Sequence, residues 1–252
     1  MPKPSSCGGS RSAVSEGTST TRRPVFGGRK NTVYRVDDRV GPAIVKVFSP
    51  ERGDLAKKEF QMLEECIRRG IRVPKPLELR GLELYEECIE GTNASAVVDS
   101  VWSQYLSGDP ASRESVKAVI DGVADWLAGF HRAFAFHATR GDSILKNFII
   151  GPDGSVTGID FEESVLENAD SLDDLGELCS YVMSMHPAFS SEKISLASAF
   201  ADRYWALSGI RPDHERLSHA VAKALRHYGA FRADGDVMVQ WALRLESGET
   251  RL

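Results

Sequence analysis

Apolar and polar positions alternate along the first part of the chain with the two-residue period that is typical of β-strands. From Val25 to Phe48, three such runs are separated by turns rich in glycine and aspartate, which predicts three strands. Two further runs, at 77–79 and 82–89, flank Arg80-Gly81 and predict a hairpin. The N-terminal part is therefore expected to form a small antiparallel sheet.

A helical period interrupts these strands once. Residues 54–69 predict a helix that Asp54 caps and that Gly70 ends. Its apolar face is predicted to hold Phe60, Leu63 and Ile67.

Helical spacing dominates the C-terminal part. A helix is predicted from Val116 to His131, because apolar residues recur on one face there. Strands are predicted at 148–150 and 156–159 around a turn, and the chain from about Asp173 is expected to be helical, with boundaries at Pro187 and Pro212.

This order of elements predicts an α+β protein with two lobes. Residues 1–22 are rich in Ser, Gly, Thr and Pro and are predicted to be a disordered tail. Residues 23–90 are expected to form the sheet-containing N-lobe and 91–252 the mostly helical C-lobe, with a hinge at Gly91-Thr92. Small ligands usually bind in the cleft between such lobes.

Composition narrows the function classes. The 252 residues are 42% hydrophobic and 27% charged, as in an ordinary globular protein, and the net charge of -5 argues against a general nucleic-acid binder. The four cysteines show no metal-ligand spacing, and no apolar run reaches the length of a membrane helix or a signal-peptide core. We therefore expect a cytoplasmic protein with no membrane partner and no direct nucleic-acid partner.

The stretch from Arg140 to Glu162 carries the strongest chemical signal. It places Asp142, then Asn147 five positions later, and then Asp160 at the end of a strand. Such a set can orient a hydroxyl and hold metal-bound phosphates. Taken singly, each residue has a plainer interpretation, namely a local Asx turn or a cap.

Lys46 supplies a candidate cation upstream. It lies in the apolar run 43–48, where a buried ammonium needs an anionic partner, and Glu59 or Glu64 on the next helix are the candidates. An edge-strand lysine in water is the alternative. The turn around Gly27 and Gly28 is suited to close over phosphates, although short glycine signals more often mark ordinary hairpins.

With these residues in order, the chain resembles the protein-kinase-like superfamily over about Val25 to Leu178. It is most similar to the compact members: the aminoglycoside and choline phosphotransferases, the RIO kinases and the small kinase of the tRNA threonylcarbamoyl machinery. The resemblance implies a bilobal protein-kinase-like fold, with a small antiparallel sheet lobe and a larger helical lobe. ATP and Mg²⁺ are the cofactors that it implies.

The resemblance also assigns roles in the N-lobe. Lys46 would hold the α- and β-phosphates, and Glu59 would be its helix partner, with Glu64 as the fallback. The other nucleotide-binding residues that it implies are Gly27, Gly28 and Asn31 in the covering loop, and Glu87 and Ile89, whose backbone groups would bind adenine.

In the C-lobe, the resemblance implies that Asp142 is the catalytic aspartate. Asn147 and Asp160 would be the metal ligands. Asp174 would be the buried helix residue that braces the catalytic loop.

Three departures accompany the resemblance. Arg140 replaces the usual histidine and is expected either to pair with Asp174 or Asp160 or to lie on the surface. Glu162 replaces a common glycine and is expected to be exposed to solvent, although it could instead bind metal or substrate. The short distance from Glu162 to Asp174 leaves no room for a long activation segment.

The sequence therefore predicts an ATP- and Mg²⁺-dependent phosphotransferase, with the hydroxyl of a small molecule or of a protein as acceptor. The alternative is a nucleotide-binding pseudokinase, scaffold or ATPase that regulates a partner complex. The departures at Arg140 and Glu162 keep that alternative open.

Overall fold

The structure is a computed structural model that describes residues 22–27, 31–38 and 41–252. The predicted tail lies outside these residues except for Arg22, which begins the first strand. Gly28, predicted to cover the nucleotide, also lies outside the described residues.

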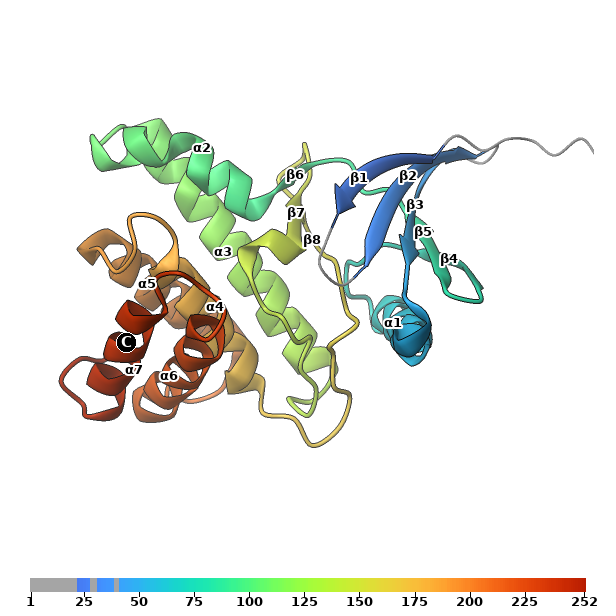
Figure 1. Ribbon diagram of the computed structural model, residues 1–252. Helices are drawn as coiled ribbons and strands as arrows, with labels where there is room; N and C mark the ends of the chain where they lie inside the picture. The colour runs from blue at the N-terminus through green and yellow to red at the C-terminus, as the bar shows by residue number, and fades with distance from the viewer. Residues whose placement is uncertain (1–21, 28–30, 39–40) are drawn as a thin grey trace, which may run out of the picture.

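A five-stranded antiparallel sheet forms the smaller part of the molecule, as predicted (Figure 1). The strand order is β1-β2-β3-β5-β4, so the hairpin β4–β5 joins the sheet beside β3. The strands are β1 (Arg22–Gly27), β2 (Thr32–Asp38), β3 (Gly41–Val47), β4 (Pro76–Arg80) and β5 (Glu83–Glu87).

Helix α1 (Gly53–Arg68) follows the short 3-10 helix η1 (Pro50–Arg52) and packs against β4 and β5. The predicted cap is wrong, because the helix begins one residue earlier and Asp54 is an exposed residue of its first turn. The predicted apolar face is also rotated. Leu63 is buried, but Ile67 is exposed, and the buried face includes Glu59.

The larger part of the molecule is helical, with one small three-stranded sheet, β6-β7-β8, where the two parts meet (Figure 1). Helix α6 packs on α4 and α7, and α3 packs on α2 and α5. The elements are β6 (Thr92–Asn93), α2 (Ala94–Leu106), α3 (Pro110–Ala133), η2 (Leu145–Asn147), β7 (Phe148–Ile150), β8 (Val156–Gly158), α4 (Ser171–Ser184), α5 (Ser191–Ser208), α6 (His214–Gly229) and α7 (Gly235–Glu246).

The chain passes from β5 to the helical part through Gly91. Its φ of +153° is a conformation that side chains disfavour, and an added Cβ would lie 2.3 Å from the carbonyl oxygen of Ile150. Because residue 91 is a glycine, the crossing segment between β5 and β6 can lie directly against β7.

Apolar side chains from both parts meet in one continuous core. Phe48, Met62 and Leu84 from the sheet part belong to the same buried cluster as Phe130, Phe148 and Phe161. Among the residues that the structure describes, no helix has the length and apolar character that a membrane span requires.

Candidate active site

Lys46 lies where the sheet, α1 and the segment after β8 meet. Lys46 is only 6% exposed. Its Nζ donates to the Glu59 carboxylate at 2.8 and 3.0 Å and to Asp160 Oδ1 at 2.6 Å. Burial alone would lower the pKa of Lys46, but the carboxylates of Glu59 and Asp160 outweigh it and raise that pKa. The ammonium is therefore permanently charged. The alternative that Lys46 lies in water on an edge strand is wrong, because β3 pairs with a strand on each side.

Glu59 is the acid that meets this ammonium. It points inward from α1, is fully buried, and also accepts a hydrogen bond of 2.9 Å from the backbone N–H of Phe161. Glu64, the fallback partner, is exposed on the same helix. One carboxylate thus connects β3, α1 and the residue that follows Asp160.

Arg140 is buried rather than exposed, with a relative exposure of 0%, so the surface interpretation is wrong. Its guanidinium donates to the backbone carbonyls of Asp142 (2.8 Å), Ile159 (2.5 Å) and Asp160 (3.3 Å). The Cζ atom of Arg140 lies over the rings of Phe148 and Phe161, at 5.0 and 5.2 Å from their centroids.

The carbonyls that Arg140 binds belong to strained backbone. Asp142 and Asp160 both have positive φ, +44° and +66°, a region that costs a residue with a side chain about 1 kcal/mol or more. Gly141 precedes them at φ +66°, and a Cβ there would lie 2.5 Å from the carbonyl oxygen of Glu163. Arg140 therefore holds both acidic residues in the conformation that aims their side chains.

Asp174 supports the backbone of the same loop. Its carboxylate accepts hydrogen bonds from the backbone N–H groups of Arg140 (2.7 Å) and Gly141 (3.1 Å). His131 Nε2 lies 2.9 Å from the same carboxylate, and its Nδ1 lies 2.8 Å from the Tyr204 hydroxyl. All three side chains are buried, which gives α3, α4 and α5 a common polar support for the loop.

Asp142 and Asn147 lie together in this loop. Asn147 Nδ2 donates to the Asp142 carbonyl at 2.8 Å and to its carboxylate at 3.2 Å. The Ile159 N–H donates to the Asn147 carbonyl at 2.9 Å, so Asn147 lies next to the residue that precedes Asp160. With its nitrogen directed at Asp142, the amide presents its oxygen as an acceptor.

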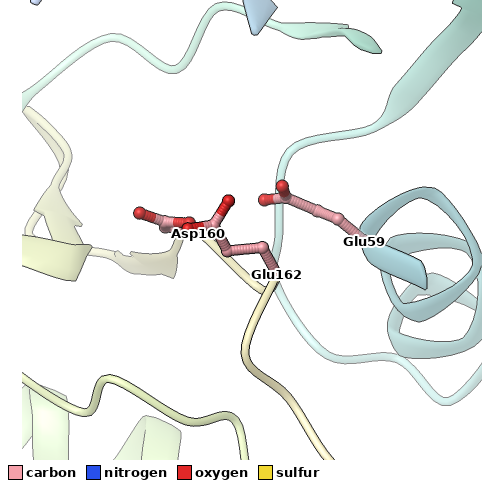
Figure 2. A group of neighbouring side chains, drawn as sticks. All are labelled: Glu59, Asp160 and Glu162. Carbon is pink, nitrogen blue, oxygen red and sulfur yellow. The ribbon is translucent and has the colours of Figure 1, made fainter. Parts of the chain in front are cut away.

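Glu162 is buried, and the prediction of solvent exposure is wrong. Only 3% of the residue is exposed, because Asn31 and Arg52 both donate to its carboxylate. Figure 2 shows Glu162 and Asp160 on one side and Glu59, reaching across from α1, on the other.

These three acids, Glu59, Asp160 and Glu162, each place a carboxylate oxygen within 4.8 Å of the others. The Lys46 ammonium lies among them, 4.0 Å from Glu162, and balances part of their charge. Asp160 keeps 34% of its side chain exposed. A carboxylate and an amide oxygen are ligand types that Mg²⁺ takes, so the chemistry of Asp160 and Asn147 suits the predicted metal.

The remaining nucleotide candidates lie at the rim of the sheet. Gly27 ends β1 opposite Thr32, and Asn31 is the residue before β2. The backbone N–H of Glu87 already donates to the Lys75 carbonyl at 2.9 Å, which leaves only its carbonyl for adenine. Ile89 lies half-buried in the crossing segment.

Several residues at the site were not predicted. The Tyr228 hydroxyl of α6 donates to Asp142 Oδ1 at 3.4 Å, and Glu177 of α4 accepts from the Ser143 N–H at 2.8 Å. Burial raises the pKa of Glu177 to about 7. No local motif marks these residues, since only the packing of α4 and α6 brings them to the loop.

Comparisons with known proteins give a result by structure alone. No protein-family model matches the chain, and no curated protein matches it. An aminoglycoside phosphotransferase from Streptomyces rimosus, solved with ADP and streptomycin, superposes with a TM-score of 0.58 at 16% identity, covering 91% of this chain and 94% of that one.

The chain has a protein-kinase-like fold. A second structure, assigned as a fructosamine-3-kinase from Haemophilus somnus, agrees with a TM-score of 0.52 at 11% identity and covers 89% and 90% of the two chains. The small antiparallel sheet and the larger helical part agree with the fold that the sequence predicts. As predicted, only a short segment follows Glu162 before the next helix, α4. At such low identity the likeness shows the fold and leaves the chemistry to be argued from the site.

Proposed function

We propose that this protein is an ATP- and Mg²⁺-dependent phosphotransferase that transfers the γ-phosphoryl group to a hydroxyl. One observation carries the proposal. A charged Lys46, fully paired with Glu59, reaches Asp160 at 2.6 Å, and Arg140 ties the Asp160 backbone to that of Asp142. The cation, the metal-binding acid and the candidate base are thus parts of one rigid group, which is what a transfer in line with the acceptor needs.

Each residue has a definite task in this proposal. Lys46 holds phosphate oxygens, and Glu59 keeps the ammonium aimed. Asp142 accepts the hydrogen bond of the acceptor hydroxyl and takes its proton as the oxygen–phosphorus bond forms. Arg140 and Asp174 hold the loop, so that Asp142 does not need to reorganise during the reaction.

Asp160 and Asn147 would hold Mg²⁺. When bound, the ion neutralises charge on the phosphates and orients them. The backbone of the crossing segment, with the Glu87 carbonyl and the Ile89 backbone groups, would receive adenine, and the turn at Gly27 and Gly28 would cover the phosphates.

A small molecule is the acceptor that we favour. The two structural neighbours are named for small-molecule substrates, and only residues 163–170 separate Glu162 from α4. A short segment at this position offers little surface on which a protein substrate could be laid out.

The proposal is tested by measuring ADP release with Mg-ATP and a panel of hydroxylated metabolites. Asp160→Asn keeps the volume but removes the charge, and it should lower turnover by about a hundredfold or more. Thermal-shift measurements with Mg-ATP, carried out in parallel, separate nucleotide binding from turnover.

Asp153→Asn is the matched control. Asp153 is an exposed aspartate in the turn between β7 and β8, where it accepts from the Ser155 N–H, and Asn can fill that role. Its turnover should equal that of the wild type. A wild-type protein that binds Mg-ATP but releases no ADP with any acceptor, or without one, would contradict the phosphotransferase and favour a nucleotide-binding scaffold.

A further inference from the structure

Glu162 makes two contacts that the proposed chemistry does not use. Its Oε2 accepts from Asn31 Nδ2 at 2.5 Å, and its Oε1 accepts from Arg52 at 2.8 Å. The partners lie 131 and 110 residues away in sequence, and both belong to the sheet part of the molecule. Glu162 itself lies on the segment that carries Asp160. The two contacts therefore cross from one part of the molecule to the other.

The two donors occupy the ends of structural elements. Asn31 immediately precedes β2. Arg52 ends η1 and is the N-cap residue of α1, and its side chain makes no capping hydrogen bond there. A single carboxylate thus contacts the start of β2 and the start of the helix that carries Glu59.

The charges favour this arrangement over a chance contact. A carboxylate with 3% exposure needs compensation, and it receives a guanidinium, an amide and, at 4.0 Å, the Lys46 ammonium. An ionised carboxylate only accepts hydrogen bonds, so the amide nitrogen of Asn31 must face it. One of the two N–H groups of the Asn31 amide is then committed to Glu162.

Building on the proposed function, we propose that Glu162 is a positioning residue, and that its contacts with Asn31 and Arg52 hold the start of β2 and the start of α1 against the Asp160 segment. Because α1 carries Glu59, which accepts from Lys46, the contact at Arg52 also bears on the groups that would hold the phosphates. Its effect is directed at the nucleotide. It should therefore influence the KM for ATP more than the KM for the acceptor.

The first test does not depend on activity. Hydrogen–deuterium exchange of the nucleotide-free protein is compared between wild type and Glu162→Gln, which keeps the volume and loses the charge. Peptides that cover residues 31–38 and 50–60 should exchange faster in the variant, whereas peptides of α6 should be unchanged. Arg52→Gln, at a partly exposed position, provides a second variant should Glu162→Gln fail to fold.

Asn31→Asp tests the direction of the hydrogen bond. It replaces the donor with a second carboxylate facing Glu162, so it should accelerate exchange more than Asn31→Ala does. The like charges disappear in Asn31→Asp/Glu162→Gln, which should recover part of the wild-type protection. Equal effects of Asp and Ala at position 31 would overturn the proposed contact.

The second test uses kinetics. Glu162→Gln should raise the KM for ATP about tenfold and leave the acceptor KM within about twofold, since only nucleotide positioning is lost. Glu83→Gln, which removes an exposed ion pair with Arg22 in the same sheet, is the control and should change neither value. Unchanged exchange and unchanged KM for ATP in Glu162→Gln would overturn the proposal. Faster exchange in a protein that shows no turnover would instead overturn the proposed function and leave the Glu162 contacts standing.

Discussion

Glu86 is a carboxylic acid enclosed in the wall of the site. It lies on β5, where it is the register partner of Ile44 on β3 and of Pro76 on β4, and it is buried. Burial, followed by the negative charge of Glu59, raises its pKa from 4.5 to about 8, although Lys46 opposes the shift. At neutral pH Glu86 is therefore largely protonated, so the Lys46 ammonium is left to balance Glu59 and Asp160.

This shift makes stability depend on pH. The folded protein retains the Glu86 proton between its ordinary pKa of 4.5 and the raised value of about 8, whereas the unfolded chain releases it. The contribution is complete at low pH and is lost as pH rises through the folded pKa. We expect the free energy of unfolding to fall by about 3 kcal/mol more between about pH 5 and pH 8 in wild type than in Glu86→Gln.

Urea unfolding at stepped pH measures this slope. Glu90→Gln, an exposed position just beyond β5, is the matched control and should retain the wild-type slope. Parallel pH profiles for wild type and Glu86→Gln would show that Glu86 is not the titrating group.

Residue types and order could be predicted at the site, but burial could not. Lys46, Asp142, Asn147 and Asp160 stand in a readable pattern, and the structure brings them together. Arg140 offers no such signal, because its partners are backbone carbonyls that any sequence carries.

The burial of Glu162 could not be predicted for a related reason. Its partners are an asparagine and an arginine more than a hundred residues away, and nothing in the sequence pattern links either of them to Glu162. A charged residue looks solvent-exposed in sequence unless its partner can be identified with it.

At the scale of elements, the contact between β8 and α3 holds the Asp160 segment in place. Gly158 ends β8 against the ring of Trp126, and an added Cβ would lie 2.4 Å from Cζ2 of that ring. Trp126 is itself fixed, since its Nε1 donates to the Arg72 carbonyl at 2.8 Å and its ring meets Phe130 and Phe148. The ring therefore cannot move away cheaply.

Gly158→Ala should consequently destabilise the protein by about 1–3 kcal/mol through overpacking. Because Asp160 follows two residues later, turnover should fall together with stability. Urea unfolding gives the first quantity and ADP release the second.

Gly129→Ala is the control, and it should change the free energy of unfolding in the opposite direction. Gly129 lies within α3 and has no atom within 4 Å of an added Cβ. Alanine there should stabilise the protein by about 0.5–1 kcal/mol through its higher helix propensity. Equal effects of alanine at positions 129 and 158 would contradict the packing argument.

Periodicity predicted most elements. Helix α3 has a clear apolar face, and the predicted helix lies entirely within it. No bounds were predicted for α2, although Val97, Val98, Val101 and Trp102 lie on one broad face that packs in the core.

At the scale of the whole molecule, the sheet and helical parts are joined on two sides. On one side lie the contacts of Lys46, Glu59 and Glu162 described above. On the other, the Arg72 carbonyl in the connector between α1 and β4 accepts from the Gly158 N–H at 3.2 Å and from Trp126. The buried core also runs across the boundary without a break.

We therefore expect both parts to unfold together. The four tryptophans, in α2, α3, α5 and α7, report only on the helical part, so a second probe is needed for the sheet. Native-state hydrogen exchange should give β3 amides the same opening free energy as α3 amides, equal to the value from tryptophan fluorescence.

A lower opening free energy for β3 than for α3 would mean that the sheet part unfolds on its own. The contacts on the two sides would then be too weak to couple the parts. The boundary predicted at Gly91 would in that case also separate two units of stability.

The bilobal arrangement could be predicted from the sequence because strands precede helices almost without mixing. The way in which the parts meet could not, since it depends on single contacts such as that of Arg72 with Trp126.

Residues 163–170, between Glu162 and the start of α4, are too few to form a loop that folds away and returns. For the activity proposed above, we therefore expect no switch by phosphorylation of an activation loop at this place. Control of the rate would then have to act outside this segment, through the supply of the two reactants or through the amount of protein.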